Sequence, residues 1–132
     1  MSHIDEINVS TVFEYNGKQW EFDIADADTS DTFERAVRNM EETSKEIPKT
    51  GKSSDAIRAQ CKIIKNFFDD CLGAGAGEDI CTTRDNVSVC YDAYAAFLEL
   101  VRGQKDRILG MGNVFSKYSN RAQRRAAAKA EK

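Results

Sequence analysis

The sequence has few of the residues that enzymes use for catalysis. Only one of its 132 residues is a histidine, His3, and it lies close to the N-terminus. No Ser-His-acid or Cys-His arrangement can be assembled around a single terminal histidine. Neighbouring carboxylates such as Asp69 and Asp70 point in different directions on a helix, and solvation accounts for them. We therefore assign no catalytic residue and predict that the chain is not an enzyme.

Long apolar runs are also missing. No stretch of the sequence approaches the roughly 20 apolar residues that a membrane-spanning helix needs. Residues 1–6 contain neither the basic region nor the apolar region of a secretory signal. We therefore expect no membrane partner and a location in the cytoplasm of the cell that makes the chain.

The four cysteines do not form the close pairs that zinc sites use. They are spaced ten, ten and nine residues apart, and no Cys-x-x-Cys pair occurs. The sequence therefore predicts no metal and no cofactor. In a reducing compartment we interpret the thiols as small core residues. They are Cys61, Cys71, Cys81 and Cys90.

Two further motifs have simple structural explanations. The Gly-Ala-Gly-Ala-Gly run at 73–77 follows a predicted helix and leads into two acidic residues, which would repel phosphate. We interpret it as a helix C-cap and turn rather than a nucleotide-binding loop. Asp26, Asp28 and Asp31 lack the glycine and glutamate of a calcium loop, so they are expected to cap a helix.

A β-hairpin is predicted at about residues 9–24. Asn16-Gly17 is typical of a two-residue type I′ turn, because both positions of that turn need a positive φ. The turn places the aromatic residues on one face and mostly polar residues on the other, as expected for a hairpin packed on a core. The expected pairs are Tyr15 with Lys18, Phe13 with Trp20, Thr11 with Phe22, and Val9 with Ile24.

Three main helices are predicted at about 29–47, 54–72 and 86–102, each with apolar residues at three- and four-residue spacing. The expected N-caps are Asp28 or Thr29, Ser53 or Ser54, and Asp85 or Asn86. Pro48 and Gly51 end the first helix. Ile80 and Cys81 are expected in a short connector between the second and third helices. Three glycines interrupt the chain after the third helix, so a flexible segment is expected there; they are Gly103, Gly110 and Gly112.

The fold class is therefore α+β and mainly α, with the hairpin packed on a bundle of three main helices. We expect one globular domain at 1–116 and a basic, flexible helical tail at 117–132. The tail has strong helix formers but no apolar stripe to bury from about Ser119 onward.

Charge is distributed unevenly along the chain. Residues 117–132 carry a net charge of +5, whereas residues 1–46 carry −8. This polarity indicates a protein that assembles with other proteins, and the tail can bind the acidic surface of a neighbouring subunit. Arg121, Arg124 and Arg125 can also contact phosphates, although the net charge of −3 disfavours nucleic acid as a partner.

An aromatic cluster on the second and third helices has two interpretations. Phe67, Phe68, Tyr91 and Tyr94 can line a groove for an amphipathic partner helix. Aromatic residues at helical spacing are also typical of a core. Both interpretations stay open from the sequence alone.

The order of four segments resembles a known family. An aromatic hairpin (15–24) is followed by an acidic helix start (26–36), then Phe-Phe-Asp-Asp-Cys-Leu-Gly (67–73) and Tyr-Ser-Asn-Arg-Ala-Gln-Arg-Arg (118–125). In this order the chain resembles the tail assembly chaperones of long-tailed phages and prophages of Gram-positive bacteria.

The resemblance implies a mostly helical, non-enzymatic protein that coats the tape measure protein while the tail tube polymerises. It also implies other tail proteins as partners and a second, longer product made by ribosomal frameshifting. The residues themselves favour a homo-oligomer, and the opposite charges of the two ends favour head-to-tail assembly. Two alternatives remain: a structural or connector component retained in the virion, and a small nucleic-acid-binding regulator that uses the basic tail.

Overall fold

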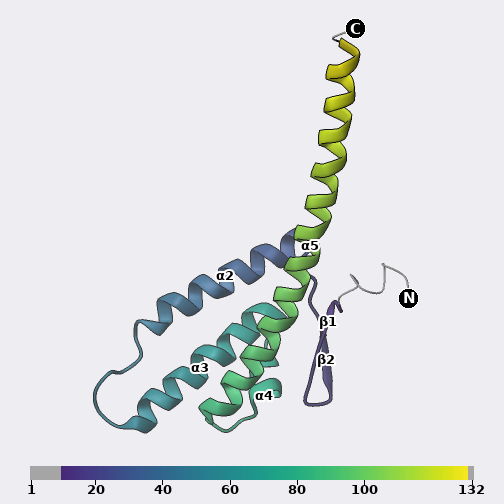
Figure 1. Ribbon diagram of the computed structural model, residues 1–132. Coiled ribbons are helices and arrows are strands. Elements are labelled where there is room, and N and C mark those ends of the chain that lie inside the picture. The colour runs from purple at the N-terminus through teal and green to yellow at the C-terminus, as the bar shows by residue number, and fades with distance from the viewer. Residues whose placement is uncertain (1–9, 131–132) are drawn as a thin grey trace.

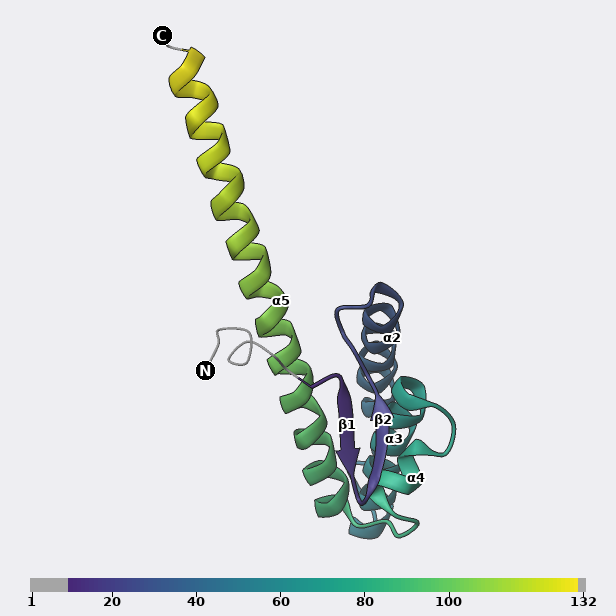
Figure 2. The same ribbon diagram turned by 90° about the vertical axis from the view of Figure 1, so that its right-hand side faces the viewer.

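The computed structural model describes residues 10–130 and is 69% helical, with an N-terminal antiparallel hairpin followed by helices. Helices α2, α3 and the first part of α5 lie side by side, and the hairpin lies along α5 (Figures 1 and 2). This arrangement confirms the mainly helical α+β fold. The elements are β1 (Val12–Tyr15), β2 (Lys18–Glu21), α2 (Ala27–Ser44), α3 (Ser53–Leu72), α4 (Ala76–Cys81) and α5 (Val87–Ala130).

The hairpin has the predicted register. Phe13 pairs with Trp20 and Tyr15 with Lys18, and the Phe22 N–H donates to the Thr11 carbonyl at 2.7 Å. Asn16 and Gly17 have φ values of 52° and 75°, as a type I′ turn requires. The expected partner of Ile24, Val9, lies outside the described residues.

The aromatic face and the tip of the hairpin pack on the helices. Phe13 is 4% exposed and packs on the core. At the tip, the Asn16 side-chain amide donates to the Ile80 carbonyl at 2.8 Å, and Lys18 pairs with Asp79 at 3.0 Å. These two contacts join the turn to α4, a short helix where the sequence analysis expected only a connector.

Helix α2 begins and ends earlier than the sequence predicted. Its N-cap is Asp26, whose carboxylate accepts from the Thr29 N–H at 3.1 Å, so the prediction of Asp28 or Thr29 was wrong. The helix ends at Ser44 rather than at about 47. The next three residues close tighter turns, in which the Ile47 N–H donates to the Ser44 carbonyl.

Helix α3 has the predicted length but a different start. Its N-cap is Lys52, which makes no side-chain cap, so the serine caps expected at 53 or 54 were wrong. Its C-cap is Gly73, with φ of 110°, as the glycine run predicted. Gly77 then lies so close to α3 that a Cβ there would be 2.7 Å from the Lys65 Cα.

The core is centred on one aromatic ring. Phe97 of α5 is fully buried, and its ring centroid lies 4.9–6.4 Å from five other phenylalanine rings, with most pairs edge to face. Such geometry is favourable for aromatic quadrupoles. The five partners come from the hairpin, α2 and α3, so one residue joins all the layers; they are Phe13, Phe22, Phe33, Phe67 and Phe68.

Helix α5 is much longer than the third helix predicted at about 86–102, so the flexible segment predicted after that helix was wrong. It runs unbroken from Val87 to Ala130 and passes through the glycines expected to interrupt it after residue 102. Asn86 caps its start, because the Asn86 side-chain oxygen accepts from the Ser88 N–H at 3.0 Å. Once the buried half is nucleated, each further residue adds one hydrogen bond, and this propagation carries the helix through positions of low propensity.

Candidate protein-interaction surfaces

Two of the aromatic residues expected to bind a partner belong to the core. Phe67 and Phe68 are 1% and 0% exposed, and their rings pack on Phe97. The prediction that both rings line a groove for a partner is therefore wrong. The two residues are adjacent in α3, and both are covered. The Phe67 ring packs on Phe33 of α2 and Tyr94 of α5, and the Phe68 ring packs on Phe13 of the hairpin.

Tyr91 and Tyr94 lie differently, at the edge of an apolar pocket. Tyr91 is 47% exposed and Tyr94 is half-buried. Burial raises the pKa of Tyr94, so its hydroxyl stays protonated at neutral pH. The pocket has a volume of about 230 Å³ and is lined mainly by apolar side chains from the ends of α2 and α3, including Met40, Ile47 and Ile63.

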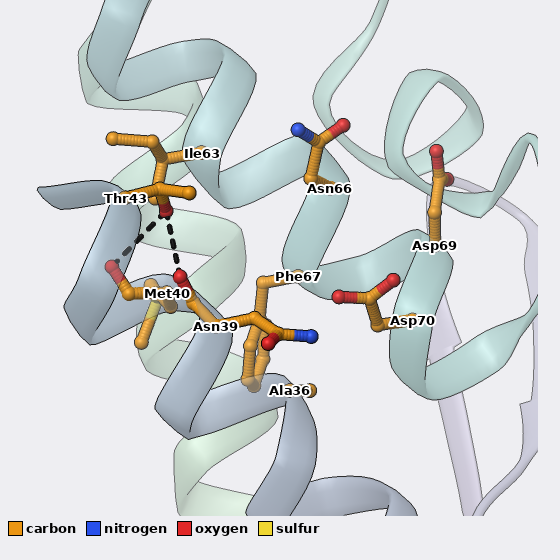
Figure 3. Close-up of a pocket in the computed structure, with 9 residues that line it drawn as sticks. All are labelled: Ala36, Asn39, Met40, Thr43, Ile63, Asn66, Phe67, Asp69 and Asp70. Carbon is orange, nitrogen blue, oxygen red and sulfur yellow. Dashed lines mark hydrogen bonds between the residues drawn. The ribbon is translucent and has the colours of Figure 1, made fainter. Parts of the chain in front are cut away.

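A second pocket continues the first along the α2–α3 seam. It has a volume of about 290 Å³ and shares Met40 and Ile63 with the first pocket. Figure 3 shows Asn39 of α2 and Asp70 of α3 projecting into the gap between the helices. We call the two adjoining pockets the α2–α3 groove. Its complete lining comprises Ala36, Asn39, Met40, Glu41, Thr43, Ser44, Ile47, Gln60, Ile63, Ile64, Asn66, Phe67, Asp69, Asp70, Tyr91 and Tyr94.

Several polar groups of the groove are acidic or already hydrogen-bonded. The Thr43 hydroxyl donates to the Asn39 carbonyl at 2.8 Å, one turn back on its own helix (Figure 3). The Asp69 carboxylate accepts from the Gly77 N–H at 2.7 Å. Glu41 and Asp70 are exposed at the two ends of the groove. The groove therefore has an apolar floor and an acidic rim.

The last part of α5 leaves the rest of the molecule (Figures 1 and 2). Cys90, Phe97, Val101 and Gln104 face the core and are 0–4% exposed. Beyond Gln104 the exposed fraction of large apolar side chains rises to 39–65%. We call residues 105–130 the arm and residues 10–104 the body. The exposed apolar side chains of the arm are Ile108, Leu109, Met111 and Val114.

A regular spacing of apolar or buried residues crosses the boundary between body and arm, and the predictions from the sequence did not include it. Apolar or buried residues alternate at four- and three-residue spacing from Cys90 through Tyr94, Phe97, Val101 and Gln104, and then continue to Ile108 and Met111. The same helix face is therefore buried in the body and uncovered in the arm. The three glycines concealed this continuity, and the large apolar side chains described from Ile108 onward are 39–65% exposed.

The basic residues of the predicted tail lie in the last part of the arm. Helix α5 includes Arg121, Arg124 and Arg125, and the Arg125 side chain is exposed. The helical state predicted for the tail is present up to Ala130, and residues 131–132 lie outside the described range. The arm contains seven basic residues and one acidic residue, a net charge of +6.

The thiols are poorly suited to chemistry in this fold. Cys61, Cys81 and Cys90 are fully buried, and Cys71 is half-buried. Burial, followed by the hydrogen bond with Cys90, raises the pKa of Cys61 to about 11, and burial raises the pKa of Cys71 to about 12. Within residues 10–130, no group of three or more Cys, His, Asp or Glu side chains is arranged to hold a metal ion. The cysteines are core residues, as predicted.

These features define a small, mainly helical protein with a compact body, an apolar groove and a protruding basic arm. No helix in the described part of the chain is both long and apolar enough to cross a membrane. Residues 16–128 match the family described as a family of unknown function (DUF6673), and the chain belongs to this family. No curated protein and no solved structure matches the chain.

Proposed function

We propose that this protein is a non-enzymatic tail assembly chaperone of a phage or prophage, which binds the tape measure protein in the cytoplasm of the bacterial host during tail tube assembly. The observation that carries the proposal is the arm. Ile108, Met111 and Val114 are 39–54% exposed on a helix that extends beyond the body. An apolar helix face without a cover is typical of a protein that binds another helix.

The energetics of the arm support a role in binding. An isolated helix in water is marginal because most helical stability in proteins comes from tertiary packing. Gly110 and Gly112 each lower helix stability by about 1 kcal/mol relative to alanine, and a Cβ at either position would meet nothing within 4 Å. A partner that covers the apolar face would stabilise the arm. An amphipathic helix is the simplest such partner, and the resemblance described above implies that the tape measure protein supplies it.

The charges of the two parts favour self-association as well. The body contains eighteen acidic and eleven basic residues, a net charge of −7, opposite to the arm at +6. Opposite charge on the two ends of a molecule favours head-to-tail contacts between copies. We therefore propose a homo-oligomer that also binds other tail proteins.

The first test is to express the gene with its native downstream DNA and to weigh the products by intact mass spectrometry. A minor, longer product that shares this N-terminus and diverges within residues 126–132 is expected. Co-expression with the tape measure protein encoded nearby should then yield a complex that a Met111→Asp variant forms at least tenfold more weakly.

Other outcomes of the same work favour the two alternatives. Recovery of the protein in purified virions would indicate a structural or connector component. Salt-dependent binding of DNA or RNA, lost when Arg121, Arg124 and Arg125 are replaced by glutamate, would indicate a nucleic-acid-binding regulator. A single product combined with no binding to the tape measure protein would contradict the chaperone role.

A further inference from the structure

We propose that the arm of one copy packs into the α2–α3 groove of a second copy, with Ile108, Met111 and Val114 on the groove floor. The proposal names the contact through which the protein self-associates. It rests on the proposed function only in expecting self-association, and it does not depend on the tape measure protein as a partner.

The arm cannot occupy the groove of its own body. Tyr91, at one end of the groove, and Ile108, at the start of the apolar patch, lie on the same unbroken helix. They are 17 residues apart, which corresponds to about 25 Å along the axis at about 1.5 Å per residue. Figure 1 shows the arm continuing away from the bundle. Within residues 10–130 the arm patch stays 39–54% exposed and does not reach the groove, so a second copy is needed to bring the two surfaces together.

The two surfaces match in length and polarity. Ile108, Met111 and Val114 span about 9 Å of helix, and the α2 residues that line the groove, from Ala36 to Ser44, span about 12 Å. The arm patch lies on one side of its helix, because positions three residues apart are neighbours on a helix surface.

Charge favours the pairing of an arm with a groove over the pairing of two arms. Two arms at +6 each would repel one another if they were paired side by side. The groove has the opposite sign, since Glu41 and Asp70 are exposed at its ends and the body as a whole carries −7. On the arm, Lys117 follows the apolar patch in the sequence, is exposed, and can pair with these carboxylates.

The contact is heterologous, because a groove accepts an arm while the arm of the same copy remains available. Each added copy presents a new arm and a new groove, so assembly proceeds as a ring or an open spiral. Raising the salt concentration should weaken this assembly, since salt screens the attraction between the arm and the charges at the groove rim.

The experiment uses the full chain and two variants, each blocking one surface. Met111→Asp places a charge in the arm patch, and Ile63→Lys places a charge on the groove floor. Asn113→Asp is the control for the arm, because it adds the same charge at an exposed position on the other side of that helix. Circular dichroism and thermal unfolding check that each variant is folded.

Sedimentation velocity over a range of concentrations measures the assembly state. The wild type and Asn113→Asp should grow in mass with concentration, and each blocking variant alone should remain a monomer. An equimolar mixture of the two variants should form dimers and stop, because one intact arm and one intact groove remain. Glu41→Lys, at an exposed position, should weaken assembly about two- to fivefold and provides a second groove variant if Ile63→Lys unfolds.

Three results would overturn the proposal: a wild type that is monomeric at all concentrations, loss of assembly with Met111→Asp but not with either groove variant, and a mixture that stays monomeric. These outcomes are separate from those of the function test. Absence of a longer product contradicts the chaperone role and leaves this contact intact. A monomeric wild type contradicts this contact and leaves binding to the tape measure protein intact.

Discussion

Replacing Gln104 by leucine should uncouple the hairpin from helix α5. The Gln104 side chain is 4% exposed, and its amide oxygen accepts from the Ile24 N–H at 2.9 Å. Its amide nitrogen donates to the carbonyls of Ser10 and Phe22 at 2.8 and 2.7 Å. Leucine has a similar size and makes none of these bonds, so Gln104→Leu removes three hydrogen bonds with little change in volume.

The size of the effect follows from which groups lose their partners. The Ile24 N–H becomes a buried donor without an acceptor, which costs about 1–3 kcal/mol. The Phe22 carbonyl lies in the buried part of this contact and also loses its donor, whereas Ser10 is exposed and can bind water. We expect a loss of about 2–4 kcal/mol in the free energy of unfolding, out of about 5–15 kcal/mol for a typical domain.

Urea denaturation measures this loss. With a slope of about 1–3 kcal/mol per molar urea, a loss of about 3 kcal/mol lowers the midpoint by about 1–3 M. Hydrogen exchange at the Ile24 amide should accelerate at the same time. The matched control is Gln60→Leu, which removes a 2.7 Å hydrogen bond from the exposed Tyr91 hydroxyl and should cost no more than about 0.5 kcal/mol. Equal losses in the two variants, or an unchanged exchange rate at Ile24, would refute the reasoning.

Four further predictions test the core, the glycines and the thiols. Phe97→Ala should lower the free energy of unfolding by about 3–5 kcal/mol in urea denaturation, since it empties the centre of the core. Gly77→Ala should lower the melting temperature, because its Cβ would collide with the backbone of Lys65, whereas Gly110→Ala should stabilise the arm by up to about 1 kcal/mol and raise the helical signal in circular dichroism. In the native protein, Cys61 should react with thiol reagents far more slowly than in the urea-unfolded chain, because it is buried and protonated. The unfolded Cys61 thiol loses its proton near its ordinary pKa of 9.0, and the native thiol loses it at a pKa of about 11, so the unfolded state binds fewer protons between these values. The free energy of unfolding should therefore fall as the pH rises from about 9 to 11. Cys61→Ala should reduce this fall when denaturation is measured as a function of pH.

The sequence by itself determined the hairpin and, to within two residues, the starts of the three main helices. Asn16-Gly17 imposes its turn through backbone sterics, and the turn then sets the register of Phe13 with Trp20. Gly73 ends α3 for the same kind of reason, because its φ of 110° is accessible to glycine. These are local effects that act within a few residues, and no other part of the chain has to be known to predict them.

Tertiary structure decided which of the predicted faces are covered. Phe67, Phe68, Tyr91 and Tyr94 all belong to the apolar sets of predicted helices, yet the first two are buried and Tyr91 is exposed. Burial depends on whether another element lies across the face, and helical spacing alone does not specify that element.

The end of the body was decided in the same way. The spacing that packs Phe97 and Val101 on the core continues to Met111, where no other element of the described chain covers it. The glycines at 103, 110 and 112 predict a break from local propensity, but the packed half of α5 sustains the helix beyond them because propagation needs only one hydrogen bond per residue. The sequence therefore determined where helices can form, and the packing of the body determined how far α5 extends and which of its side chains remain uncovered.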